Sequence, residues 1–476
     1  MPDDDRDSRP VLPEGFRFGV ATSGFQIEGG FNGPGEPANN WVRWEQAGQV
    51  EPSGVAVDFW NRFEEHFDRA RAMGCDAFRL SVEWARVERH PGEYDTGALD
   101  HYAVILDACR RRGLEPLVTL HHFTHPAWLG EDFWLSGDAP ARYAAWVEAA
   151  VSHLAPHCRT WVTLNEINVM GIGSYLLGTF PPGRVMALTD TVSAVDRLLA
   201  AHVKGYEVIH RIQPEAVVTT NNVSLSVYEL DRMLVDILLS RSEGVARREL
   251  RGWLGGRRAA WYAALPPAGP LERTLRRAAA ALWERRSGLS SAIDAVWESP
   301  YERTVDVVGI DYYDPVVAHR ARLPGHRTAG GSSWHPGGEL WDDRVDPAGL
   351  VQYGAANAAP GLGLWIVENG LCNRVRRARS FPRLDGWDRP RYLRGNLAAL
   401  VELLDGGVPV GAYYHWSLVD NYEWGSYEPR FGIHGVDRER GLRVLDTDAM
   451  GMDAAGAFRH MVEGLRSGDR SVLDEH

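Results

Sequence analysis

The feature that most constrains the fold is an alternation of short apolar runs with longer amphipathic segments along all 476 residues. Runs such as LWIVENG and VDVVGIDYY are rich in β-branched and aromatic residues, which favour strands. The segments between them show the spacing of apolar residues that is typical of helices. Strands that alternate with helices indicate βα units around a parallel sheet, so an α/β fold is predicted.

Eight strands are predicted, which is the number that closes one (β/α)8 TIM barrel with extended βα loops. They are placed at 16–22, 77–82, 115–121, 160–165, 216–222, 305–312, 364–368 and 410–415. Barrels of this length fold as one unit, so residues 1–476 are predicted to form a single domain. Within it, we expect a flexible tail at 1–12, a helical insertion at 227–300 between strands 5 and 6, and a C-terminal tail at 465–476.

Charge and composition narrow the class of partner. The formal net charge is −13 at pH 7, and nucleic-acid binders usually present a basic face, so a small molecule is expected and nucleic acid is not. The four cysteines form no CxxC pair, which argues against a zinc site. The first residues are acidic and no stretch is apolar for long enough to span a membrane, so a cytoplasmic protein is expected. Association into a homo-oligomer is compatible with these features.

Glutamates stand at the ends of two predicted strands. Glu166 follows the fourth strand and Glu368 ends the seventh, so both carboxyl groups are predicted to face the C-terminal mouth of the barrel, where barrel active sites lie. Cleavage of a glycoside needs two carboxyl groups, one to protonate the leaving oxygen and one to attack or to activate water. A single glutamate at a strand end is more often a capping or salt-bridge residue. The recurrence of polar residues at successive strand ends favours catalysis.

A family resemblance is carried by six motifs that follow one another along nearly the whole chain. They are FRFGVATSGFQIEGG, FRLSVEWAR, HHFTHPAWL, TLNEI, WIVENG and HWSLVDNYEW. In these motifs the chain resembles glycoside hydrolase family 1, the β-glucosidase family. The resemblance implies a retaining β-glycosidase that removes a terminal, non-phosphorylated β-D-glycosyl residue of the gluco, galacto or fuco type from a small or hydrophobic aglycone.

The resemblance also implies roles for individual side chains. Glu166 is expected to be the general acid/base and Glu368 the nucleophile of a double displacement, with Arg79 and Tyr313 hydrogen-bonded to Glu368. Substrate binding is assigned to Gln26, His122, Asn165, Tyr313, Trp416 beneath the sugar ring, Glu423 and Trp424, with Trp341 at the aglycone side. No metal and no other cofactor is expected, because two carboxyl groups supply both proton transfer and attack.

Several positions depart from the family pattern. The usual asparagine of the NYY motif is Asp311, which adds a carboxyl group beside the site and is expected to raise neighbouring carboxyl pKa values. Ile167 and Val367 replace a usual proline and threonine, and the loop 424–431 is one residue shorter than usual. In the phospho-glycosidase branch of the family, a small residue typically stands where this chain has Glu423.

Two other functions are compatible with these patterns. A transglycosidase or a deglycosylase of a hydrophobic natural product would keep the same fold, and the tryptophans of the insertion, Trp253, Trp261 and Trp283, favour it. A catalytically inactive sugar-binding protein is disfavoured because both glutamates are present. Product analysis with and without an acceptor alcohol distinguishes the first alternative, and turnover of an aryl β-glycoside distinguishes the second.

Overall fold

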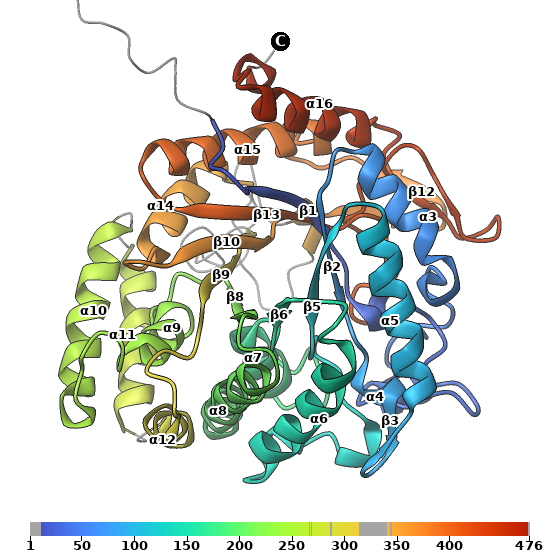
Figure 1. Ribbon diagram of the computed structural model, residues 1–476. Helices are drawn as coiled ribbons and strands as arrows, with labels where there is room; N and C mark the ends of the chain where they lie inside the picture. The colour runs from blue at the N-terminus through green and yellow to red at the C-terminus, as the bar shows by residue number, and fades with distance from the viewer. Residues whose placement is uncertain are drawn as a thin grey trace, which may run out of the picture.

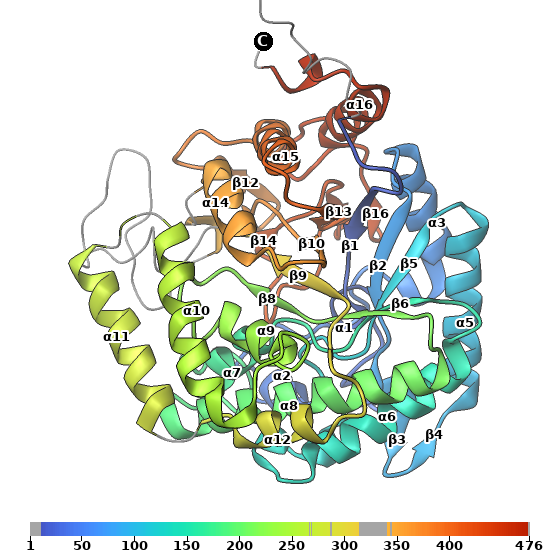
Figure 2. The ribbon, with the colours of Figure 1, turned by 60° about the vertical axis from the view of Figure 1, so that its left-hand side comes forward.

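The computed structural model describes residues 11–474 apart from 266, 268, 286–287, 314–339 and 343–344. At its centre, parallel strands form a barrel with helices around the outside (Figure 1, Figure 2). This arrangement confirms the predicted TIM barrel. In hydrogen-bonding order the strands are β7 (Val217–Thr219), β6 (Thr160–Val162), β5 (Glu115–Thr119), β2 (Ala77–Ser81), β1 (Arg17–Ala21), β13 (Val410–Trp416), β10 (Gly363–Glu368), β9 (Val307–Asp311) and β8 (Asn221–Val223).

The predicted fifth strand, 216–222, forms two short strands where one was expected. Strand β7 pairs with β6 on one side, β8 pairs with β9 on the other, and Thr220 separates them. The Thr220 hydroxyl donates a hydrogen bond to the carbonyl of Leu164 at 2.7 Å, which ties the break to the neighbouring chain. Because β7 and β8 are the two ends of the sheet and are one residue apart, the fifth strand closes the barrel.

The outer layer consists of helices whose apolar faces pack on the barrel. In α5 (Thr96–Arg111) the buried positions include Leu99, Tyr102 and Leu106, which recur every three or four residues, and Asp95 caps the first turn by accepting from the Ala98 amide at 3.0 Å. The other long outer helices are α3 (Phe59–Ala72), α6 (Ala139–Leu154), α8 (Leu188–Ile212), α14 (Pro347–Asn357), α15 (Arg389–Asp405) and α16 (Ala454–Ser467).

The long connection between β8 and β9 contains α9 (Arg232–Leu239), α10 (Leu250–Ala264), α11 (Pro270–Arg285) and α12 (Ser290–Glu298). Helices α10 and α11 stand at the left edge of the molecule in both views (Figure 1, Figure 2). Trp261 and Trp283 are buried, and Trp253 is half-buried beneath the guanidinium of Arg257. Two of the three tryptophans behind the hydrophobic-substrate alternative therefore serve the packing of the insertion.

The two ends of the described chain are packed. Val11 is buried in the main hydrophobic core, although 1–12 was expected to be a tail, of which residues 1–10 lie outside the described part. The segment expected as a C-terminal tail contains the end of α16 and a short turn at Ser471–Leu473, because Leu465 and Val472 are both buried. Among the described residues, no helix combines the length and the apolar character needed to cross a membrane.

The remaining short elements connect the barrel units and build loops at its ends. The helical ones are α1 (Gly24–Ile27), α2 (Val42–Gln46), α4 (Trp84–Val87), α7 (Ile167–Tyr175), η1 (Ala127–Leu129), η2 (Phe133–Leu135), η3 (Arg247–Glu249) and η4 (Leu340–Asp342). The extended ones are β3 (Glu88–His90), β4 (Glu93–Tyr94), β11 (Asn373–Arg376), β12 (Arg379–Phe381), β14 (Pro429–Arg430), β15 (Val436–Asp437) and β16 (Arg443–Val444). Of these, α1 carries Gln26 of the candidate site, and Glu166 lies immediately before α7.

Candidate active site

Three carboxyl groups meet at the C-terminal mouth of the barrel. Asp311 and Glu368 are the last residues of the paired strands β9 and β10 and lie opposite each other in the ladder. Glu166 comes from the connection that follows β6. Each of the three residues offers an oxygen atom, and these atoms lie within 4.8 Å of one another. All three side chains are buried, so their charges interact across a medium of low dielectric constant.

Glu166 is held by an unusual backbone conformation. It is the residue immediately before α7, and its dihedral angles, φ 41° and ψ 64°, lie in the left-handed region. The preceding residue is anchored, since the backbone N–H of Asn165 donates a hydrogen bond to the backbone carbonyl of His121 at 2.9 Å. The left-handed residue is the point at which the connection after β6 enters α7. Sparsely populated backbone conformations of this kind cluster at functional sites.

Two side chains, one from β2 and one from the segment just after β9, hold Glu368. Arg79 of β2 is fully buried and forms an ion pair with one carboxylate oxygen, and the Tyr313 hydroxyl donates to the other at 2.7 Å. The same guanidinium donates to the Thr119 hydroxyl at 3.0 Å and to the Asn165 amide oxygen at 2.6 Å. Both oxygens of Glu368 are therefore engaged by donors, which orients the carboxylate toward the mouth.

The electrostatics of the three carboxyl groups are coupled. Burial raises the pKa of Glu166 well above its ordinary value, and the charges of Glu368 and Asp311 raise it further. Burial also raises the pKa of Glu368, but Arg79 and Tyr313 oppose this rise. The pKa of Asp311 is raised well above its ordinary value by burial and by Glu368. Glu368 is thus the group best placed to carry the negative charge, whereas Glu166 favours its proton.

A second polar group lies beside the carboxyl groups. The Gln26 amide of α1 donates to one oxygen of Glu423 at 3.1 Å, and the indole N–H of Trp416 donates to the other at 3.1 Å. Burial raises the pKa of Glu423 to about 8, so its neutral form predominates at pH 7 in the absence of a ligand. No Arg or Lys among the described residues forms an ion pair with Glu423. The group is thus suited to hydrogen-bond neutral hydroxyls.

Aromatic rings form one wall of the site. The His122 ring is nearly parallel to Trp416 at 5.7 Å and to Trp424 at 5.8 Å, and burial keeps its pKa well below the ordinary value, so it is neutral. Trp424 is supported from behind by Trp41 and Phe180, at 5.6 and 5.5 Å between ring centroids. The wall therefore consists of neutral rings that are fixed in position.

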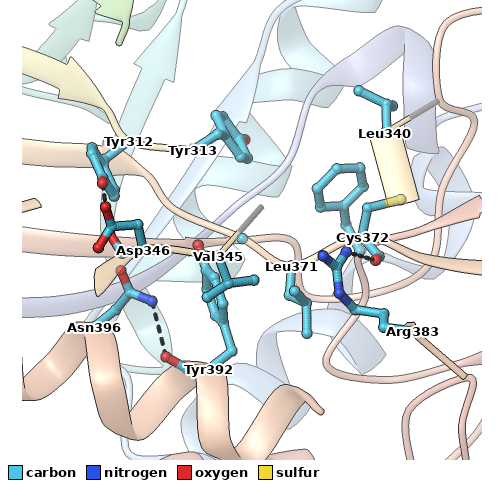
Figure 3. A pocket seen from close by; sticks show the side chains of 12 residues that line it. Tyr312, Tyr313, Leu340, Val345, Asp346, Leu371, Cys372, Arg383, Tyr392 and Asn396 are labelled. Atoms are coloured by element: carbon cyan, nitrogen blue, oxygen red, sulfur yellow. Dashed lines mark hydrogen bonds between the residues drawn. The ribbon is translucent and has the colours of Figure 1, made fainter. Parts of the chain in front are cut away.

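A small pocket lies next to Tyr313 (Figure 3). Its lining comes from the ends of β9 and β10, from α15 and from neighbouring loops: Tyr312, Tyr313, Leu340, Val345, Asp346, Gly370, Leu371, Cys372, Arg383, Tyr392, Asn396 and Phe431. Trp341 lies on this side of the site. The Arg374 guanidinium is 4.6 Å from the centroid of the Trp341 ring, and the backbone carbonyl of Trp341 accepts a hydrogen bond from Arg383 at 3.0 Å. It packs against the apolar cluster that contains Trp416.

One side chain of the site was not singled out in the sequence. The Asn221 amide of β8 donates both to Asp311 and to the Asn165 amide oxygen, the latter at 2.8 Å. Asn221 is the second-last residue of the predicted fifth strand, 216–222, so the signal that identified the glutamates, a polar residue near the C-terminal end of a strand, was also present there. The family motifs did not include it.

Barrels with paired carboxyl groups at their C-terminal mouth are a common architecture of glycoside hydrolases. The family model for glycosyl hydrolase family 1 matches residues 8–447 of this chain, which therefore belongs to that family. The protein is accordingly a glycoside hydrolase.

Its relatives in sequence and in structure cover almost the whole chain. Beta-glucosidase 6 of Oryza sativa subsp. japonica is 26% identical over 490 residues, which cover 92% of this chain and 88% of that protein. A 6-phospho-beta-galactosidase of Staphylococcus aureus strain JH9 is 25% identical over 460 residues, with 90% and 94% covered. The solved beta-glucosidase from Thermotoga maritima in complex with methoxycarbonyl-substituted glucoimidazole has a TM-score of 0.72 at 22% identity and covers 96% of this chain and 99% of its own. The names of the two sequence relatives differ in whether the sugar carries a phosphate.

Proposed function

We propose that the protein is a retaining β-glycosidase that removes a terminal, non-phosphorylated β-D-glycosyl residue of the gluco, galacto or fuco type from a small or hydrophobic aglycone. The observation that carries this proposal is the short separation of Glu166 and Glu368. One carboxyl oxygen of Glu166 lies within 4.8 Å of one carboxyl oxygen of Glu368. Retaining glycosidases hold their two carboxyl groups about 5–5.5 Å apart, whereas inverting enzymes need about 6.5–9.5 Å to accommodate a water molecule. The short separation supports direct attack by one carboxylate.

In the first step, Glu368 attacks the anomeric carbon and forms a covalent glycosyl-enzyme. Arg79 and Tyr313 keep it ionised and oriented until the bond forms. Glu166, which burial and the neighbouring charges keep protonated, transfers its proton to the leaving oxygen. In the second step, Glu166 accepts a proton from water while the water attacks the anomeric carbon and releases Glu368.

The sugar is bound by the polar group and the aromatic wall. Glu423 and Gln26 offer a carboxyl group and an amide to sugar hydroxyls, and Asn165 offers a second amide next to Glu166. Trp416 covers the apolar C–H face of the pyranose, since indole faces pack well on such surfaces. His122 and Trp424 extend the wall, and Trp341 borders the aglycone on the Tyr313 side.

Hydrolysis should proceed with retention of anomeric configuration, because two successive displacements at one carbon restore the original configuration. Proton NMR of the first minutes of hydrolysis of an aryl β-glycoside should show the β-anomer of the free sugar before mutarotation. Observation of the α-anomer as the first product would contradict the assignment of Glu368 as nucleophile.

The enzyme should prefer an unphosphorylated glycon. The described partners of Glu423 are hydrogen-bond donors without positive charge, so a phosphate dianion would lose hydration without gaining an ion pair there. We expect kcat/KM for a nitrophenyl β-glycoside to exceed that for its 6-phosphate by about tenfold or more, which corresponds to about 1.4 kcal/mol. The variant Glu423→Ser should narrow this ratio, because it removes the carboxyl group. A wild-type preference for the 6-phosphate would refute the prediction.

A further inference from the structure

Asp311 is a third carboxyl group at the site, and one of its oxygens accepts no hydrogen bond from the residues that the structure describes. Its side chain is fully buried at the end of β9, and Asn221 donates to one carboxylate oxygen. The other oxygen, Oδ1, is buried and has no hydrogen-bond donor within the described part of the chain. A buried carboxylate oxygen that lacks a donor is costly, so a proton on a neighbouring group would be strongly attracted to it.

The network around Asp311 leaves one partner for that oxygen. Arg79 donates to the Asn165 amide oxygen, which also accepts from Asn221, and Asn221 in turn donates to Asp311. Among the described residues, the carboxyl groups grouped with Asp311 are those of Glu166 and Glu368. Both oxygens of Glu368 already accept from Arg79 and Tyr313. Glu166 is therefore the carboxyl group that can donate a proton to Asp311.

We propose that Asp311 is a positioning residue whose free oxygen accepts a hydrogen bond from the protonated carboxyl group of Glu166 and thereby holds the acid proton in place. This inference rests on the proposed role of Glu166. In the first step the proton passes from Glu166 to the leaving oxygen, and Asp311 remains a carboxylate. In the second step Glu166 accepts a proton from the attacking water, and the hydrogen bond to Asp311 forms again.

Asp311 should change the pH dependence of both steps. The ionisable groups that interact with it are Glu166, Glu368, Arg79, Tyr313 and Tyr353. Because a neighbouring carboxylate raises the pKa of Glu166, the acid stays protonated to a higher pH than it would beside an asparagine. In the glycosyl-enzyme, Glu368 is an uncharged ester and no longer raises the pKa of Asp311, whereas Arg79 and the Asn221 amide still favour the charged form of Asp311. Asp311 therefore continues to raise the pKa of Glu166 in the second step, although the contribution of the Glu368 charge is lost.

The test compares the wild type with Asp311→Asn, which keeps the shape and an acceptor for Asn221 but removes the charge. With an alkyl β-glycoside, whose departure needs the acid, the basic limb of the kcat/KM profile should move down by about one pH unit. With a dinitrophenyl β-glycoside, whose phenolate leaves unaided, kcat/KM at high pH should stay unchanged. The acid limb of kcat for that substrate should also move down, provided that its second step limits the rate.

Two further variants complete the test. Asp311→Ser, smaller and uncharged, should give the same shift if Asp311→Asn does not fold. Asp196→Asn removes a buried carboxylate that caps α12 through the Ser291 and Ala292 amides, so it should leave both limbs in place. The proposal would be overturned if the basic limb did not move in Asp311→Asn. It would also be overturned if kcat/KM fell by the same factor with the alkyl and the dinitrophenyl substrate. Failure of the wild type to cleave either substrate would instead contradict the proposed function.

Discussion

Replacing Glu368 by alanine is expected to lower kcat/KM for every β-glycoside by a factor on the order of 10⁴ or more. The covalent intermediate cannot form without this carboxylate, and no property of the leaving group can compensate for that loss. Initial rates with a dinitrophenyl and with an alkyl β-glycoside should therefore fall together. The substitution also leaves the buried Arg79 guanidinium without its counter-ion, so the free energy of unfolding should decrease.

Added azide distinguishes the loss of the nucleophile from unfolding. In Glu368→Ala the small anion can occupy the vacated position and attack from the same face of the sugar, which should form the α-glycosyl azide and restore turnover of the dinitrophenyl substrate. Circular dichroism at the assay temperature controls for the expected loss of stability. Full activity of the variant without azide, or formation of the β-azide, would show that Glu368 is not the nucleophile.

The second large effect should come from Glu166→Ala, and it should depend on the leaving group. An alkyl β-glycoside, which needs protonation of its leaving oxygen, should lose on the order of 10²–10⁴ in kcat/KM. A dinitrophenyl β-glycoside should keep its first step almost intact, because its phenolate departs without a proton. A burst of phenolate followed by slow turnover should therefore appear in stopped-flow measurements, since the second step lacks its general base.

Azide again reports on the assignment. In Glu166→Ala the nucleophile is still present, so azide should attack the glycosyl-enzyme from the opposite face and yield the β-glycosyl azide. Each glutamate variant is thus the control for the other, because the same reagent should give products of opposite configuration. If the two configurations were exchanged, Glu166 and Glu368 would have to exchange roles.

The barrel could be predicted because each of its strands appears in the sequence as a short, nearly continuous apolar run. The break in the fifth strand at Thr220 could not be predicted from the sequence. Thr220 is β-branched and favours strands, and no local pattern indicates that its neighbours pair on opposite sides. Hydrogen-bond pairing between strands is decided by the closure of the whole barrel, which a local sequence window does not contain.

The candidate site shows the same division. Family motifs indicated that Arg79 and Tyr313 should lie against Glu368, and in the structure both contact its carboxylate. The link from Arg79 through Asn165 and Asn221 to Asp311 joins four separate segments of the chain, so no single motif contains it. The position of Trp341 is likewise decided by tertiary packing, here by Arg374 and Arg383.

The left-handed backbone at Glu166 lowers the stability of the folded protein at a position that the proposed activity requires. A residue with a Cβ atom in this conformation costs about 1–2 kcal/mol relative to the right-handed region, whereas glycine adopts it freely. Burying the glutamate carboxyl group near two others adds a further cost. Natural selection for thermal stability alone, or sequence design that optimises this backbone without its substrate, would therefore favour glycine at position 166 and remove the acid. Under the proposed function, a glutamate at this position therefore gains turnover at the expense of folding free energy.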